Sequence, residues 1–216
     1  MCGRSGATSK KRWPSSTKRK SPASSGWRSL ASTPEGPPTS VELAIDQTVF
    51  IILAWLFVAA VVVHNLEEAL LLPAWSEQAG RWHSPVGAPE FRFAVSMLTL
   101  LAGTTAVLAS VQGRGSLGAY LLSGYALAML LNVVFPHVLA TIAMRRYMPG
   151  TATAVALNLP VTAALLRLAF REEYIAPMRF AWAGPAVVMA IMLSIPALFY
   201  LGRKLWPDTG KASRRT

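Results

Sequence analysis

Long apolar runs, separated by short polar segments, make up most of the chain after its first 40 residues. Each run approaches or exceeds the roughly 20 residues that an α-helix needs to cross about 30 Å of hydrocarbon. The pattern therefore predicts an all-α fold, a polytopic transmembrane helix bundle of about five spans. The spans are expected at residues 45–72, 93–111, 117–144, 151–170 and 180–201.

The connections between these spans are short, apart from residues 73–92. Short connections make consecutive helices antiparallel neighbours. Small residues along the third span, such as Gly118 and Gly124, favour close approach of neighbouring helices. Prolines inside or near the ends of spans, among them Pro136 and Pro160, can kink a helix or free carbonyl groups that shape a cavity.

The composition supports this class of protein. Apolar residues make up 53% of the chain and charged residues 14%, which is too apolar for an ordinary soluble domain. The net charge of +11 lies mostly in the two ends. Without a nucleic-acid recognition motif, this charge indicates basic segments beside a membrane, so we expect membrane lipid and no nucleic acid as partner. The single cysteine, Cys2, excludes an intrachain disulfide and a cysteine-based metal site.

Residues 1–40 differ from the rest. They are rich in Ser, Pro, Gly, Lys and Arg, with Glu35 as their only acid, so we expect a disordered basic tail. The tail has the composition of a transit peptide. Alternatively, the native protein begins near Val41, whose codon could be a GTG start. The predicted organisation is this tail, a transmembrane helical domain at 41–203, and a basic C-terminal tail at 204–216.

Lys and Arg residues close to the span ends predict the orientation. They are more numerous on the side of residues 73–92, 145–150 and the C-terminal tail than on the other side. We therefore expect a protein of the bacterial cytoplasmic membrane with the N-terminus outside and the C-terminus inside. Counting every cation of the N-terminal tail reverses the balance, so the prediction depends on the true start.

His64, Glu67 and Glu68 form a polar cluster in the last third of the first span. Ionisable side chains are costly at bilayer depth and usually have partners or a function there. Positions three and four apart share one face of a helix, so all three side chains can point into the bundle. The alternative is a helix end at the membrane interface, where Glu–His pairing serves no chemistry.

Antiparallel threading brings further polar residues to the same side of the membrane. Asn132 and His137 stand near the end of the third span, and Asn158 lies in the first two turns of the fourth. Glu172 and Glu173 fall on the opposite side. The chain order alone therefore separates a polar cluster from an outlying pair of acids.

His64, Glu68 and His137 would supply two imidazoles and one carboxylate. This set suits Zn²⁺, or an iron site with open positions. Glu67 would then be free to act as a general base on a metal-bound water, whose acidity the metal raises. His83, in the segment 73–92, is a further candidate ligand.

The two asparagines are expected to support this site. Asn158 is a candidate for orienting a ligand or a substrate carbonyl. Asn132 stands five residues before His137, a poor match to one helical face unless a kink at Pro136 changes the register. Hydrogen bonding between helices is the alternative for both asparagines.

These groups support more than one function. The first is a metal-dependent hydrolase or isomerase, acting on a lipophilic substrate that enters from the bilayer. The second is a transporter or an ion conduit, although five spans without an internal repeat differ from most secondary transporters. The third is a structural accessory subunit of a membrane assembly.

The chain resembles the HXXEE family of small integral membrane proteins, whose motif stands here as His64-Asn65-Leu66-Glu67-Glu68. The resemblance covers about residues 50–170, and residues 1–40 lie outside it. It implies a multi-pass membrane protein with a suspected active or metal site and no established reaction. A second polar block also resembles the family: Asn132, His137, Tyr147-Met148-Pro149-Gly150, Thr153 and Pro160.

Overall fold

Helices, and no strands, form the part of the chain that the computed structural model describes, residues 40–80 and 84–206. Five of these helices are long and apolar enough to cross a membrane: Ser40–Gln78, Ala88–Gln112, Leu117–Met144, Thr151–Arg171 and Pro177–Leu205. The all-α bundle of five spans is thus confirmed. His83 and nearly all of both predicted tails lie outside the described residues.

Two of the five spans are interrupted, so the structure has more elements than spans. In chain order they are α1 (Ser40–Gln78), α2 (Ala88–Gln112), α3 (Leu117–Asn132), η2 (Val133–Val138), α4 (Leu139–Met144), α5 (Thr151–Thr153), η3 (Ala154–Asn158), α6 (Leu159–Arg171) and α7 (Pro177–Leu205).

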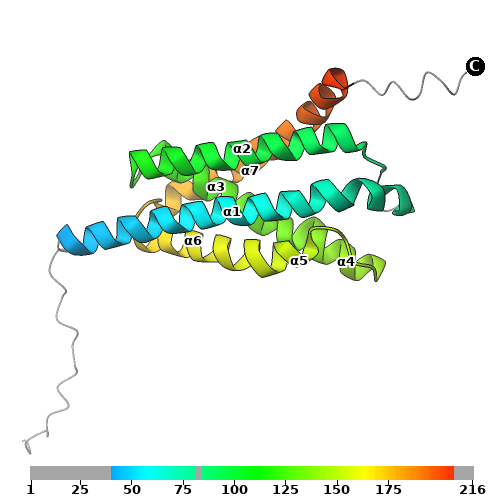
Figure 1. The fold of residues 1–216 in the computed structure, drawn as a ribbon. Helices are drawn as coiled ribbons and strands as arrows, with labels where there is room; N and C mark the ends of the chain where they lie inside the picture. The colour runs from blue at the N-terminus through cyan, green and yellow to red at the C-terminus, as the bar shows by residue number, and fades with distance from the viewer. Residues whose placement is uncertain (1–39, 81–83, 207–216) are drawn as a thin grey trace, which may run out of the picture. The chain divides into compact units, whose positions relative to one another are not determined.

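Consecutive spans run antiparallel, as predicted from their short connections. α1 packs between α2 and α6, while α3 contacts α2, α6 and α7 (Figure 1). At one end of the bundle, Trp75 Nε1 donates to the carbonyl of Tyr147 at 3.0 Å. At the other end, the amide of Gly115 donates to the carbonyl of Tyr174, also at 3.0 Å. Trp75 and Tyr147 therefore meet at one end of the bundle, and Gly115 and Tyr174 meet at the other end.

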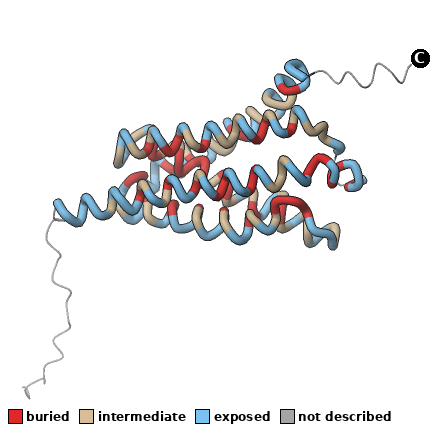
Figure 2. Tube along the Cα trace, viewed as in Figure 1, coloured by how far each residue is buried: buried red, intermediate tan, exposed pale blue. Residues whose placement is uncertain are grey.

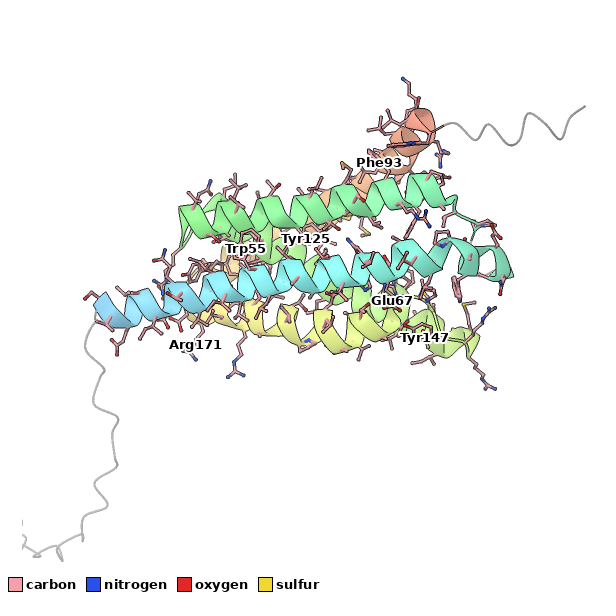
Figure 3. All side chains as sticks on the ribbon, viewed as in Figure 1. Trp55, Glu67, Phe93, Tyr125, Tyr147 and Arg171 are labelled. Atoms are coloured by element: carbon pink, nitrogen blue, oxygen red, sulfur yellow. The ribbon has the colours of Figure 1, made fainter. Side chains whose placement is uncertain are left out.

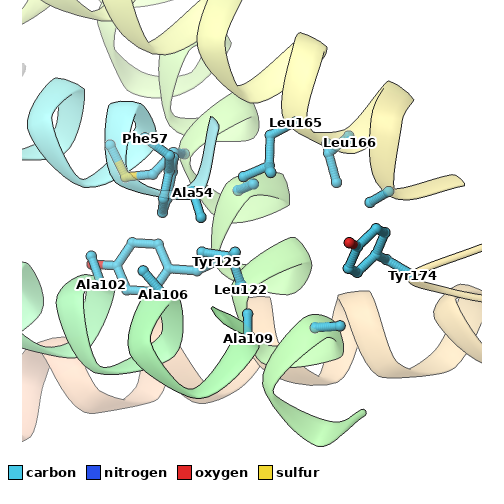
Figure 4. Close-up of a cluster of buried hydrophobic side chains, with 14 of the residues drawn as sticks. Ala54, Phe57, Ala102, Ala106, Ala109, Leu122, Tyr125, Leu165, Leu166 and Tyr174 are labelled. Carbon is cyan, nitrogen blue, oxygen red and sulfur yellow. The ribbon is translucent and has the colours of Figure 1, made fainter. Parts of the chain in front are cut away.

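The inner faces of the helices are buried and the outer faces are exposed (Figure 2). Fully buried Phe50, Phe57, Leu122 and Leu165 fill the interior between α1, α3 and α6 (Figure 4). Large apolar side chains also cover the outside, where Leu193, for example, is 69% exposed. Such a surface suits contact with lipid, because water-soluble monomers expose few large apolar patches.

α1 is longer than its sequence predicted, because Pro73 does not end it. A proline inside a helix leaves the carbonyl four residues earlier without its usual donor. Here that carbonyl belongs to Ala69, and Arg92 Nε donates to it at 3.1 Å. Ser76 Oγ donates to the Pro73 carbonyl at 2.7 Å. The helix therefore continues to Gln78, and the predicted loop at 73–92 shrinks to residues 79–87.

The third and fourth spans are both irregular near the end of the bundle that holds Trp75 and Tyr147. In η2, Phe135 leaves the helical conformation, with φ −127° and ψ 120°. A residue before proline prefers this extended region, so Pro136 breaks the third span. In η3 the helix widens to a π-turn between Ala154 and Asn158. Such bulges are common at functional sites.

Charged residues join three segments at the opposite end. Arg114 Nη2 lies 3.7 Å from Asp46 Oδ2 and 3.7 Å from Glu172 Oε2, and the Arg114 guanidinium covers the ring of Tyr174. A hydrogen bond from Arg171 lowers the pKa of the Glu172 carboxyl. Glu172 thus lies away from His64, as the chain order predicted.

Gly118→Ala is expected to destabilise the bundle, because a Cβ at Gly118 would stand 2.5 Å from the Leu108 carbonyl carbon and 2.6 Å from the Ala109 nitrogen. Overpacking of this kind costs about 2 kcal/mol. The control is Gly103→Ala in α2, where nothing lies within 4 Å of the new Cβ. Thermal unfolding in detergent, followed by circular dichroism, measures both. Equal stability of the two variants would contradict the close contact between α2 and α3.

Candidate metal centre

Three side chains with metal-binding atoms meet at the end of the bundle where the third and fourth spans are irregular. Glu68 Oε1 lies 3.2 Å from His137 Nε2 and 3.8 Å from His64 Nε2. The two imidazole rings are 4.8 Å apart and nearly perpendicular, and both are fully buried. The ligand atoms of all three residues lie within 4.8 Å of one another, so the group could hold a metal ion.

The helices position these groups for simple reasons. His64 and Glu68 are four residues apart in α1 and therefore share a face. His137 follows the break at Pro136, which resolves the unfavourable five-residue spacing from Asn132. As a result Asn132 also reaches the cluster, with Nδ2 3.2 Å from His64 Nε2. The kink considered from the sequence is thus present, and it brings Asn132 and His137 to one site.

A hydrogen-bonded chain fixes the orientation of the His64 ring. His64 Nδ1 is 3.0 Å from Thr153 Oγ1, and Thr153 Oγ1 donates to Glu67 Oε2 at 2.7 Å. Since the Thr153 hydroxyl gives its proton to the carboxylate, it accepts one from His64 Nδ1. The proton of neutral His64 is then on Nδ1, and the lone pair of Nε2 accepts from Asn132 Nδ2. This arrangement is typical of metal-binding histidines, which donate through the ring nitrogen that does not bind the metal.

Residues at or just before the start of the fourth span donate hydrogen bonds to both oxygens of the Glu67 carboxylate. Its Oε1 accepts from the amide of Gly150 at 2.9 Å and from the hydroxyl of Tyr147, which lies at the same end of the bundle (Figure 3). Burial, and then the bond to Glu67, raises the pKa of the Tyr147 phenol, so Tyr147 remains a donor. Glu67 therefore lies on the Nδ1 side of His64, away from the candidate ligand atoms. Its action as a general base remains a prediction.

Gly150 closes the site at the turn between the third and fourth spans. Its φ is +92°, a conformation that glycine adopts readily and other residues rarely. A Cβ at this position would stand 2.6 Å from His137 Cε1 and 3.0 Å from both Glu68 Cγ and His64 Cε1. The turn at residues 147–150 thus packs its glycine directly against all three candidate ligands.

Three buried residues among those described, Ser123, His137 and Asn158, have polar side-chain atoms without hydrogen-bond partners. Both nitrogens of His137 are in this position, since its contact with Glu68 lacks hydrogen-bond geometry. Both amide atoms of Asn158 are unpaired as well. An unpaired buried polar group costs about 1–3 kcal/mol, so it calls for an explanation such as a missing ligand.

The predicted site residues thus fall into two groups. His64, Glu68, His137 and Asn132 come together, and Glu67 joins them through Thr153. Asn158 stands five residues beyond Thr153, about 7 Å further along the helix. No hydrogen bond joins its side chain to the cluster among the described residues, and its supporting role remains a prediction. Residue spacing alone predicted no chemical role for Thr153 or Tyr147, although both belong to the polar block that resembles the family.

The cluster fits a metal ion after a small closure. Metal bonds of about 2.1 Å place two ligand atoms of one ion at most about 4.2 Å apart. Ligand atoms within 4.8 Å of one another are therefore within an ångström of that limit. The unpaired nitrogens of His137 and the lone pair on His64 Nε2 are the donors that such an ion needs.

Five apolar helices with a His–Glu–His group at one end fit an integral membrane protein with a candidate metal site. The chain belongs to the family described as "Protein of unknown function with HXXEE motif", which residues 55–165 match. It is also 33% identical over 151 residues to the uncharacterized protein YrkK of Bacillus subtilis (strain 168), covering 70% of this chain and 96% of that protein. No solved structure matches the chain.

Gly150→Ala is expected to lower the affinity for Zn²⁺ by about tenfold or more, because the new Cβ would push apart the side chains of His137, Glu68 and His64. The control is Gly113→Ala, which also stands at a positive φ (+74°) but has nothing within 4 Å of the Cβ. Competitive titration with a chelating dye measures the affinity. Equal affinities for the two variants would mean that Gly150 does not hold the ligands in place.

Proposed function

We propose that this protein is a membrane-embedded, metal-dependent enzyme, a hydrolase or an isomerase, that acts on a lipophilic substrate. The observation that carries the proposal is the convergence of two buried imidazoles and one carboxylate, with both His137 nitrogens unpaired and His64 Nε2 left as an acceptor. A merely structural cluster would be expected to pair the His137 nitrogens within the protein, as His64 Nε2 is paired with Asn132 Nδ2.

The ligand set supports catalysis over a purely structural metal. Structural zinc sites use four protein ligands, whereas catalytic sites use three and leave a position open. Two histidines and one carboxylate suit either Zn²⁺ or an iron ion with open positions. When bound, such an ion would polarise a carbonyl group or lower the pKa of a bound water. His64, Glu68 and His137 would hold it.

The remaining residues would position the ligands. Glu67 would keep His64 in the Nδ1-protonated form through Thr153, and the turn at Tyr147 and Gly150 would keep Glu67 in place. Direct proton abstraction by Glu67 would require its carboxylate to reach the Nε2 side of the ring. We therefore assign Glu67 a positioning role in place of the general-base role predicted from the sequence.

Charge near the helix ends supports an orientation for the site. The end of the bundle that contains the candidate metal centre also carries Arg92, Arg145, Arg146, Arg203 and Lys204. Positive charges favour the cytoplasmic side. We propose a bacterial cytoplasmic membrane location, with the C-terminus and the site on the inner side and the N-terminus outside.

The core supports an enzyme over an ion conduit. A conduit needs a polar route from one end of the bundle to the other. Here Phe50, Phe57, Leu122 and Leu165 are fully buried and fill the interior. The polar cluster is therefore open to one end of the bundle at most, as expected for a site that binds its substrate and releases its product on the same side.

Metal analysis of the purified protein tests this function. We expect about one Zn²⁺ or iron ion per chain, lost in His64→Ala and Glu68→Gln because each removes one of the three ligands. Glu77→Gln, at an exposed position of the same helix, is the matched control and should keep the metal. A wild-type protein that takes up no metal, with both site variants folded, would exclude a metal-dependent enzyme.

Glu67→Gln separates a positioning role from a general-base role. In Gln one carboxylate oxygen becomes an NH2 group, which cannot accept, so either the bond from Thr153 or the bonds from Tyr147 and Gly150 are lost and the chain that holds His64 is broken or loosened. The expected result is metal affinity lowered by about 10–100-fold, the usual effect of losing an outer partner. Metal affinity is measured by calorimetry in detergent. Unchanged affinity together with lost activity would restore Glu67 as the base.

A further inference from the structure

A small pocket links the candidate metal centre to the lipid-facing side of the bundle. It has a volume of about 130 Å³ and lies between α2, α3 and α7. Its walls are mostly apolar and include Phe91, Met129 and Ile195. Its polar end is formed by Asn65, Glu68 and Asn132. Glu68 and Asn132 also belong to the cluster around His64, so the pocket reaches the site itself.

The polar end disfavours an anionic ligand while no metal ion is bound. Glu68 brings a carboxylate to it, and no Lys or Arg is among the described residues that line the pocket. An anionic head group would be desolvated there next to a like charge, which is costly. The amide of Asn65 is occupied, since Nδ2 donates to Thr99 Oγ1 at 2.8 Å. The groups that remain suit a small uncharged head such as a hydroxyl or a carbonyl.

Asn132 is placed to bind such a head. Its Nδ2 is 3.2 Å from His64 Nε2, the nitrogen whose lone pair a metal ion would take. Once that lone pair is used, the amide of Asn132 loses its acceptor and can donate to an oxygen in the pocket. Asn132 thereby connects occupation of the metal centre with binding of the polar head.

The volume and the opening indicate how the rest of the ligand lies. About 130 Å³ is well below the roughly 300–1,000 Å³ of pockets that enclose a drug-sized ligand. The pocket therefore takes one narrow end of a molecule. Met192, which lines it, is 45% exposed on the outer surface of α7, so the remainder of the molecule can stay among the lipid chains.

We infer that this pocket binds the polar end of a single-chain lipophile with an uncharged head, such as a long-chain alcohol, aldehyde or ester, and presents that end to Glu68 and Asn132. The inference rests on the proposed function, since it names the substrate class for the same site. Most of the pocket wall comes from α2, α3 and α7, which carry none of the candidate metal ligands, so its occupancy can be tested apart from the metal.

Photolabelling with a diazirine derivative of hexadecanol tests the inference in zinc-loaded protein in phosphatidylcholine vesicles. Label is expected on residues that line the pocket, such as Met129, and should fall at least fivefold in Ile195→Trp, which fills the space. Leu193→Trp is the control, on the same helix but 69% exposed. Met192→Trp, at the mouth, is a second blocking variant if Ile195→Trp fails to fold. In metal-free protein a diazirine derivative of palmitate, which carries a negative head, should label the pocket weakly, because the Glu68 carboxylate then stands there without a compensating cation.

The outcomes distinguish the pocket from the metal. Equal labelling of the blocking and control variants, or label that spreads over outward residues such as Trp182, overturns the pocket. In that case the proposed function stays intact if the measured metal content shows that the protein binds its ion. Equal labelling of metal-free protein by palmitate and hexadecanol overturns the uncharged head. Pocket label in a protein that binds no metal supports the pocket and overturns the metal-dependent function.

Discussion

The carboxylate of Glu67 is the group on which the rest of the site depends. A carboxylate near the edge of a membrane must be satisfied by donors, and here the donors come from one short stretch of chain, Tyr147, Gly150 and Thr153. Satisfying Glu67 therefore fixes the start of the fourth span against α1. The same contacts set the proton on His64 and bring Gly150 against the ligands. One electrostatic requirement thus organises two segments that lie some 80 residues apart in the sequence.

Much of this arrangement follows from the sequence, and the exceptions have a common cause. Apolar run length identified the five spans, and antiparallel threading identified the end where His64, Asn132 and His137 gather. The continuation of α1 through Pro73 was missed, because its donor, Arg92, lies beyond the next turn. The engagement of Glu67 was missed for the same reason, since its partners lie some 80 residues later. Local pattern locates a polar group, but it does not show which distant donor will satisfy it.

The two irregular segments show how an apolar bundle accommodates a polar site. A regular third span would place Asn132 and His137 on different faces, and a break at Phe135 and Pro136 brings them together. The π-turn at Ala154–Asn158 lies directly after Thr153, the residue that joins His64 to Glu67. Both departures from ideal helix occur beside the cluster, while the core around Phe57 and Leu122 is built from regular helices. Helical regularity is thus given up only where side chains must converge.

The break at Phe135 also separates two tasks within the third span. Its longer part, α3, carries the core residues Leu122 and Tyr125, whereas His137 belongs to the shorter part beyond the extended residue. The two parts stay connected, because the amide of Leu139 donates to the carbonyls of Val134 and Pro136. The change of direction at Phe135 therefore brings the His137 ring to Glu68 while the core residues keep the spacing of a regular helix. One span thus serves both the apolar core and the polar cluster, and neither sets the register of the other.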